Sequence, residues 1–292
     1  MLRPARPPAA QADRPAPGVE ILATDRPGSF LVRSGGRDQS VVDLLEPTRL
    51  EFDYVRRMGD VVDGADAPGR PLRVLHIGGA GLTLPRYVEV TRPGSRQIVL
   101  EPDEALTARV RSELPLPRRS GIRVRPTQGR CGLTQIRDGS VDVAVLDAYR
   151  DGCVPEDLLT VECFEQVARV LSPRGAFLAN VSDHAPFSMV RDVMSGLQHL
   201  FRHRLVGAEP ATLRGRRPGN VLVIASFAEA PAAALERGAK VSASPYRVLT
   251  GSQVNDSFGG GTPLRDSHLR PPAEPAGCCV RTTGGASVVI SR

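Results

Sequence analysis

Apolar and polar positions follow two periods along most of the chain. From residue 72 to residue 226, short apolar runs typical of buried strands alternate with amphipathic stretches typical of helices. The strand candidates lie at 72–77, 96–101, 122–126, 141–147, 175–181 and 220–226. The helix candidates lie at 83–91, 103–113, 160–171 and 186–200. This α/β alternation predicts a mainly parallel sheet of about seven strands with helices on both faces. Its ligand site is expected at the carboxyl ends of the strands, where the strand order reverses.

The segment ahead of this alternation has the pattern of an antiparallel hairpin. Residues 19–45 contain short strand-like runs, and the Gly-containing stretch 34–37 is typical of the turn between two strands. Residues 47–64 follow with apolar side chains at helical spacing, which predicts an amphipathic helix that ends at Gly64. A small β-hairpin unit and one helix are therefore expected before the main domain.

Changes in composition divide the chain into four parts. The expected parts are a Pro/Ala/Arg-rich disordered leader at 1–18, the hairpin unit and its helix at 19–66, a Rossmann-like nucleotide-binding domain at 67–227, and a C-terminal extension at 228–292. The extension is rich in Gly, Pro and Ser. We expect it to form a short helix near 228–238 and a docked segment near 245–256, followed by a mobile tail.

Charge and aromatic content argue against a nucleic-acid partner. The 292 residues carry a formal net charge of +6, and the sequence pI is about 9.5. The basic residues are almost all arginine, with Lys240 as the only lysine, and they are interleaved with Asp and Glu instead of forming a patch. Trp is absent and aromatic residues make up 4% of the chain, so platforms for base stacking are not expected.

The five cysteines show no C-x-x-C spacing, and no His lies at metal-ligand spacing from them. Neither a metal site nor a disulfide framework is therefore indicated. The first 18 residues contain no apolar core of a signal peptide, and no later window is long and apolar enough to span a bilayer. These patterns predict a cytoplasmic protein without a membrane partner.

Three glycines, Gly78, Gly79 and Gly81, separate the strand candidate at 72–77 from the helix candidate at 83–91. Glycines permit a sharp turn and leave room for a ligand close to the main chain. The helix that follows presents unpaired N–H groups to the same space. The spacing differs from the G-x-G-x-x-G dinucleotide fingerprint, so the loop predicts a nucleotide site without specifying the nucleotide.

Two acids end predicted strands. Glu101 ends the strand at 96–101, where an acidic side chain can accept hydrogen bonds from both ribose hydroxyls of an adenosine. The alternative is that Glu101 only begins a loop whose Asp103 and Glu104 cap the next helix. Asp147 ends the apolar strand at 141–147, where a carboxylate is a candidate base or ligand anchor; its alternative role is a helix cap.

The order and spacing of five stretches resemble the spermidine synthase (polyamine aminopropyltransferase) family, notably its spermidine-synthase-like bacterial members. The stretches are 28–40, 75–87, 100–105, 145–181 and 213–226. The resemblance covers about residues 19–227 and implies a β-hairpin unit on a Rossmann-like domain of the S-adenosylmethionine-dependent methyltransferase type. It also implies S-adenosylmethionine or its decarboxylated form as co-substrate, no metal, and a homo-oligomer, because family members are often dimers or tetramers.

The resemblance assigns roles to several residues. Gln39 matches the hairpin glutamine that reaches the amino-acid or aminopropyl end of the nucleotide. Gly78 and Gly79 match the first glycines of the G-G-G-D-G loop, and Glu101 matches the ribose-binding acid. Asp147 matches the first Asp of a D-x-x-D pair that deprotonates the attacking amine.

Several positions depart from the family pattern, and the Tyr-His-Glu stretch of the family's hairpin region also fails to match. Gly81 replaces the Asp of the glycine loop, the adenine-contacting Gly-Asp-Ala reads 129-Gly-Arg-Cys-131 with Arg130 in place of the Asp, and Arg150 replaces the second Asp of D-x-x-D. A fixed guanidinium beside the nucleophile would repel a polyammonium acceptor and lower the pKa of Asp147. Asp151, one residue further on, is the available substitute for the second acid.

Three functions remain open at this point. The first is aminopropyl transfer to an amine acceptor by an altered acidic site. The second is methyl transfer from S-adenosylmethionine to an acceptor that is not a polyamine, which requires chiefly alignment of nucleophile, carbon and sulfur. The third is nucleotide binding without catalysis. In all three, the partners are a nucleotide and a small-molecule acceptor.

Overall fold

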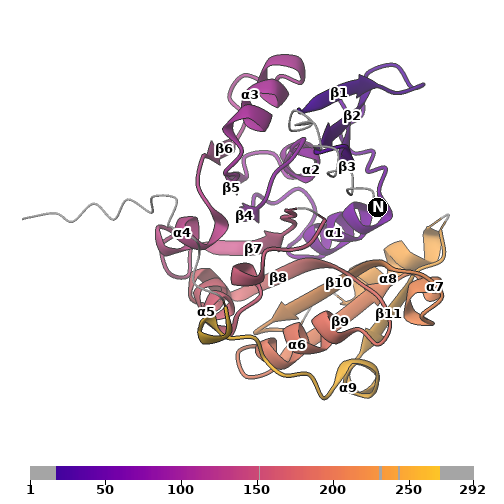
Figure 1. The fold of residues 1–292 in the computed structure, drawn as a ribbon. Helices are drawn as coiled ribbons and strands as arrows, with labels where there is room; N and C mark the ends of the chain where they lie inside the picture. Colours follow the sequence, from indigo (N-terminus) through magenta and orange to yellow (C-terminus); the bar gives the residue numbers. More distant parts are fainter. Residues whose placement is uncertain (1–17, 151, 230–231, 243, 270–292) are drawn as a thin grey trace, which may run out of the picture.

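The computed structural model describes residues 18–150, 152–229, 232–242 and 244–269. The expected disordered leader lies outside these residues apart from Gly18, and so does the expected mobile tail from residue 270 onward. Residues 257–269, expected to belong to that tail, are instead docked, because the Leu264 carbonyl oxygen accepts a hydrogen bond of 2.9 Å from the Val161 N–H. The described chain forms two sheets, of three and eight strands, with helices around the larger one (Figure 1). The domain boundaries after residues 66 and 227 stay predictions.

The smaller sheet is the β-hairpin unit that the sequence predicts. It contains β1 (Glu20–Ala23), β2 (Ser29–Ser34) and β3 (Arg37–Asp43), paired antiparallel in that order. The register between β2 and β3 shifts between Val32 and Arg33, so Gln39 stands outside the regular pairing. Such a bulge changes the direction of a side chain, and here it affects Gln39, the residue expected to contact the nucleotide.

The larger sheet has the order β11-β9-β10-β8-β7-β4-β5-β6. Its strands are β4 (Arg73–Ile77), β5 (Arg96–Leu100), β6 (Ile122–Arg125), β7 (Val141–Leu146), β8 (Leu171–Asp183), β9 (His203–Ala208), β10 (Gly219–Ser226) and β11 (Arg247–Thr250). The strands from β4 to β8 pair parallel, and β9, β10 and β11 pair antiparallel. The order reverses between β4 and β7, beside the glycine loop, as predicted.

Two strands, β9 and β11, were not among the candidates from the apolar pattern. Both are short and begin with polar residues, so the pattern alone did not reveal them. The docked segment expected near 245–256 is β11 together with the helix that follows it.

The helices are α1 (Asp53–Gly64), α2 (Thr83–Thr91), α3 (Glu104–Glu113), α4 (Gly129–Thr134), α5 (Val161–Val170), α6 (Ser188–Leu197), α7 (Pro210–Leu213), α8 (Ala232–Val241) and α9 (Ser252–Phe258). Short 3₁₀ turns, η1 (Glu156–Leu158) and η2 (Asp266–His268), follow β7 and α9. The predicted helix end at Gly64 is confirmed.

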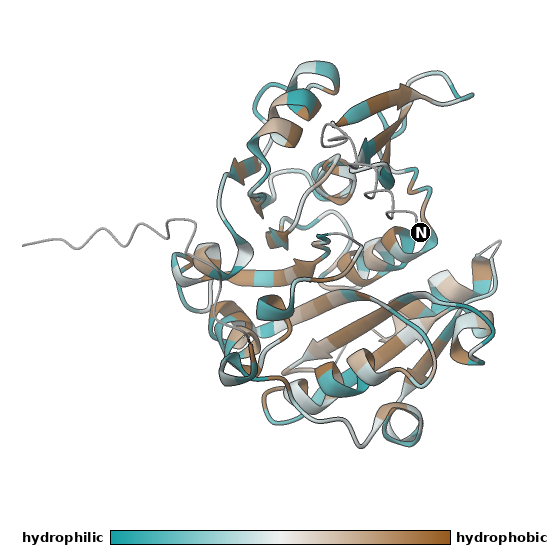
Figure 2. Ribbon diagram, viewed as in Figure 1, coloured by the Kyte–Doolittle hydropathy of each residue, from teal (hydrophilic) through white to brown (hydrophobic). Residues whose placement is uncertain are grey.

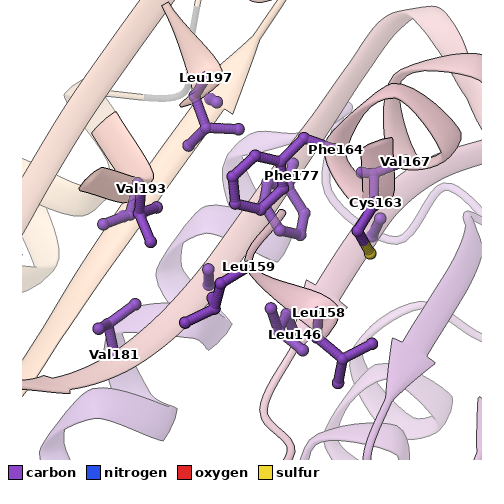
Figure 3. Close-up of a cluster of buried hydrophobic side chains, with 14 of the residues drawn as sticks. Leu146, Leu158, Leu159, Cys163, Phe164, Val167, Phe177, Val181, Val193 and Leu197 are labelled. Carbon is purple, nitrogen blue, oxygen red and sulfur yellow. The ribbon is translucent and has the colours of Figure 1, made fainter. Parts of the chain in front are cut away.

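Alternate residues of the central strands face two different cores. In β7, Ala144 and Leu146 belong to the core beneath α4, α5 and α6, whereas Val143 and Val145 belong to the core beneath α1, α2 and α8. Apolar residues accordingly concentrate on the strands of the larger sheet (Figure 2). In the first core the rings of Phe164 and Phe177 lie 5.9 Å apart (Figure 3). Helices therefore cover both faces, as the α/β alternation predicts.

A third apolar cluster fixes the small sheet beside the glycine loop. Val32 and Val42 of the small sheet pack with Leu82 and Val99, next to the buried face of α3. The carbonyl oxygen of Val41 also accepts a hydrogen bond of 3.0 Å from the Thr83 hydroxyl at the start of α2. The small sheet thus forms one wall of the space above the strand ends.

Candidate active site

Two adjoining cavities lie at the carboxyl ends of the central strands. The larger has a volume of about 1050 Å³ and lies between the small sheet, the start of α1 and the ends of β4, β7 and β8. The smaller, of about 240 Å³, lies between the glycine loop, the end of β5 and the start of α4. Six residues line both cavities, which marks their junction: Gln39, Gly78, Gly79, Ala80, Asp147 and Tyr149.

The backbone of Gly78 forms the floor of this junction. Gly78 has a φ of +89°, and a Cβ at this position would collide with the carbonyl oxygen of Asp147. Only glycine therefore permits β4 and the loop after β7 to approach so closely. Gly79 also lines both cavities, whereas Gly81 packs under β3 and donates a hydrogen bond of 3.0 Å to Ser40 Oγ.

Glu101 ties the glycine loop to the end of β5. Its Oε2 accepts a hydrogen bond of 3.0 Å from the Gly79 N–H, and its Oε1 accepts one of 3.0 Å from the Asp103 N–H. Burial raises the pKa of Glu101, and these backbone donors, with that of Ala80, act against the increase. Asp103, and not Glu101, caps α3, because its side chain accepts a hydrogen bond of 2.8 Å from the Leu106 N–H. Glu101 is thus a buried acceptor in the wall of the smaller cavity.

Asp147 lies at the junction directly after β7. Its Oδ1 accepts a hydrogen bond of 3.0 Å from Asn180 Nδ2. Burial raises the pKa of Asp147 to about 6, and the side chains of Asn180 and Tyr54 partly oppose the increase. A carboxyl group with this pKa can accept and release a proton near neutral pH.

The pKa of Asp147 corrects one expectation from the sequence. Arg150 was expected to lower this pKa, but burial raises it. Arg150 lines the smaller cavity and donates a hydrogen bond of 3.3 Å to Gln128 Oε1. Asp151, the expected substitute acid, lies outside the described residues.

Arg130 takes part in helix packing. Its guanidinium hydrogen-bonds to Thr160 Oγ1 at 2.9 Å and forms an ion pair with Asp266. Cys153 and Cys163 are free thiols.

Tyr54 and Asn180 were not identified as site residues from the sequence. Tyr54 lies in the amphipathic pattern that predicts α1, and this pattern accounts for a tyrosine at that position without any role in the site. Asn180 could have been identified from the sequence, because it is the single amide within the apolar run at 175–181. The amide is buried, and its Oδ1 has no hydrogen-bond partner among the described residues.

His76 is a buried neutral group in the wall of the larger cavity. Its Nε2 lies 3.0 Å from Gln97 Oε1, and burial lowers its pKa to about 4. Within the described residues, no group of three or more His, Cys, Asp or Glu side chains is arranged to hold a metal ion. No helix in the same residues is long and apolar enough to cross a membrane.

Comparisons with known proteins define first the class and then the family that the chain resembles. Human methyltransferase-like protein 13, solved in complex with SAH, superposes with a TM-score of 0.50 at 19% identity, covering 63% of this chain and 89% of that one. Spermidine synthase from Thermotoga maritima superposes with a TM-score of 0.52 at 16% identity, covering 82% and 80%. These likenesses show an α/β fold of the methyltransferase and spermidine synthase type.

More similar proteins identify the family resemblance. A probable spermidine synthase from Corynebacterium glutamicum superposes with a TM-score of 0.80 at 28% identity, covering 87% of this chain and 95% of that one. The polyamine aminopropyltransferase of Chromobacterium violaceum is 27% identical over 194 residues, 66% of this chain and 70% of the relative. No protein-family model matches. The predicted resemblance to the spermidine synthase (polyamine aminopropyltransferase) family is thus confirmed.

Proposed function

We propose that the chain is a spermidine-synthase-like transferase that binds S-adenosylmethionine or its decarboxylated form and transfers an alkyl group from the sulfonium to an amine. The observation that carries this proposal is the position of Asp147, a carboxyl group with a pKa of about 6 at the junction of the two cavities. The likeness to spermidine synthases supports the same reaction class.

The smaller cavity is the proposed adenosine site. Glu101, Gly78 and Gly79 line it at the strand ends. Each oxygen of Glu101 accepts one backbone N–H bond, and an ionised carboxylate can accept about four hydrogen bonds in all. Acceptor capacity therefore remains for both ribose hydroxyls.

Asp147 is the proposed base for the transfer. The lone pair of a neutral amine attacks the carbon bound to the sulfonium, the carbon–sulfur bond breaks, and its electron pair stays on sulfur as a neutral thioether. The Asp147 carboxylate accepts the proton that the acceptor ammonium must lose before its nitrogen can attack, and the nitrogen is positively charged again in the product. Aminopropyl transfer would release methylthioadenosine, and methyl transfer would release S-adenosylhomocysteine. The side chain of Asn180 holds the carboxylate at the junction.

The acids of the larger cavity favour a second candidate, methyl transfer to an acceptor that is not a polyamine. A polyammonium acceptor needs unpaired acids, because a cation taken out of water is costly without a partner. Apart from Asp147, however, every acid that lines this cavity in the described ranges is already ion-paired. These pairs are Asp38 with Arg33 at 2.8 Å, Glu51 with Arg49 at 2.9 Å, Asp53 with Arg56 at 2.8 Å, and Glu209 with Arg217.

A pair of product assays tests the proposal. The protein is incubated with decarboxylated S-adenosylmethionine and putrescine, and with S-adenosylmethionine and a panel of monoamines, while methylthioadenosine and S-adenosylhomocysteine are quantified. Product in either arm that disappears in Asp147→Asn supports the proposed reaction. Product that persists in Asp147→Asn would contradict the role of Asp147. Calorimetric titrations that detect no binding of either nucleotide or of methylthioadenosine would reject the whole proposal.

A further inference from the structure

Arg37 is an unpaired cation in the wall of the larger cavity. Among the described residues, four arginines line this cavity, and three of them, Arg33, Arg56 and Arg217, form ion pairs with carboxylates. In the part of the chain that the structure describes, no hydrogen bond or ion pair reaches the side chain of Arg37, whose backbone pairs with Ser34 in the hairpin. Its positive charge is therefore available to a ligand, while those of the other three are compensated.

The guanidinium of Arg37 lies against the loop that follows Asp147. Arg37 is the first residue of β3, on the small sheet, and a Cβ at Gly152 would collide with its Nη1 atom. Both Arg37 and Gly152 line the larger cavity. The side chain thus reaches from the small sheet to the loop after β7, and the missing side chain at Gly152 leaves room for it.

Arg37 also lies close to the junction of the two cavities. Gln39, two residues further along β3, lines both cavities, and two residues of a strand span about 7 Å. If the adenosine of a nucleotide lies in the smaller cavity, its amino-acid end must extend through the junction into the larger cavity. That end would then reach the part of the larger cavity where the unpaired guanidinium lies.

We propose that Arg37 binds the carboxylate of the methionine end of the nucleotide, so that the donor is S-adenosylmethionine and not its decarboxylated form. A guanidinium matches a carboxylate in a two-point, charge-assisted hydrogen bond, and it has no favourable partner in a decarboxylated aminopropyl chain, whose only charged terminus is an ammonium. The inference rests on the proposed nucleotide site. It also favours methyl transfer, because a donor that keeps its carboxylate cannot supply an unsubstituted aminopropyl group.

Calorimetric titration with three nucleosides tests this inference. The probes are S-adenosylmethionine, decarboxylated S-adenosylmethionine and methylthioadenosine, which lacks the whole amino-acid end. The wild type is expected to bind S-adenosylmethionine about tenfold or more tightly than the decarboxylated form, as a charge-assisted pair implies. Arg37→Gln is expected to remove most of that preference without changing the affinity for methylthioadenosine, and Arg37→Lys is expected to keep part of it.

Arg217→Gln provides the matched control. It makes the same substitution in the same cavity, but at an arginine that already has a carboxylate partner. The ratio of the two affinities is expected to stay at the wild-type value in this variant. An equal fall of the ratio in both variants would indicate a general effect of net charge and overturn the role of Arg37.

Two failures can be told apart in the same titrations. Binding of all three nucleosides with a ratio that Arg37→Gln leaves unchanged overturns the inference and keeps the nucleotide site. Wild-type protein that binds none of the three overturns the nucleotide site and the inference with it.

Discussion

The Nδ2 atom of Asn180 donates a hydrogen bond of 3.0 Å to Oδ1 of Asp147. Asn180 lies within β8 and Asp147 follows β7, so the bond joins two neighbouring parallel strands at their carboxyl ends. Because an ionised carboxylate only accepts hydrogen bonds, this contact fixes the orientation of the amide. The buried Oδ1 of Asn180 is left without a donor among the described residues, and we expect a bound amine to supply one.

Replacement of Asp147 by Asn should abolish most of the transfer reaction. An amide of nearly the same shape cannot accept the proton, and loss of a general base typically reduces a rate by about 10²- to 10⁴-fold. The affinity for methylthioadenosine should change little, because this nucleoside lacks the group that is attacked. Initial rates and calorimetry on the same preparation check both effects. A rate within about threefold of the wild type would exclude the proton-transfer role.

The pH dependence of the reaction should report the raised pKa of Asp147. Only the ionised carboxylate can accept a proton, so kcat/KM should fall as the pH decreases through about 6. The hydrogen bond from Asn180 lowers this pKa, so Asn180→Leu should move the acidic limb of the profile to higher pH. Arg150→Gln should leave the limb in place, because burial sets the pKa. If the acidic limb shifts to higher pH only in Arg150→Gln, the charge of Arg150 lowers the pKa of Asp147, as expected from the sequence.

Removal of the Glu101 carboxylate should weaken adenosine-containing ligands. Glu101→Ala loses both the proposed ribose acceptor and the bond that holds the Gly79 N–H, which should cost about 1–3 kcal/mol of binding free energy. Glu104→Ala is the control, because it removes a nearby carboxylate that lines neither cavity. Calorimetry with methylthioadenosine gives both values. If Glu101→Ala and the wild type bind methylthioadenosine with equal affinity, Glu101 only holds the glycine loop and does not bind the ribose.

A side chain at Gly78 should destabilise the fold beyond the cost of its backbone angle. Gly78→Ala combines a φ of +89° with a collision against the Asp147 carbonyl. Gly69→Ala is the matched control, since Gly69 has a φ of +74° but open space around it. We expect about 1 kcal/mol of destabilisation at Gly69 and more than about 2 kcal/mol at Gly78. Urea unfolding measures both, and similar values would show that the loop relaxes around the added methyl group.

The positions of Glu101 and Asp147 at one edge of the sheet could be predicted from the sequence. The apolar runs that end on these acids are long enough to be recognised as buried strands, and parallel strands present their carboxyl ends at the same edge. The glycine loop after β4 and the hairpin were recognised for the same local reason, since their signals lie within a few adjacent residues.

Local signals alone determined the central strands, the longer helices between them, the reversal point and the acids that follow the strands. The tertiary structure decided which side chains meet there. Tyr54, Asn180 and Arg37 come from α1, β8 and β3, and nothing in their own neighbourhoods indicates that they line the same cavity as Asp147. It also decided the direction of the pKa shift at Asp147, because a sequence shows the charge of Arg150 but not the burial that removes water from the carboxyl group. Pairing and desolvation depend on distances between segments that are remote in the chain, and those distances exist only after folding.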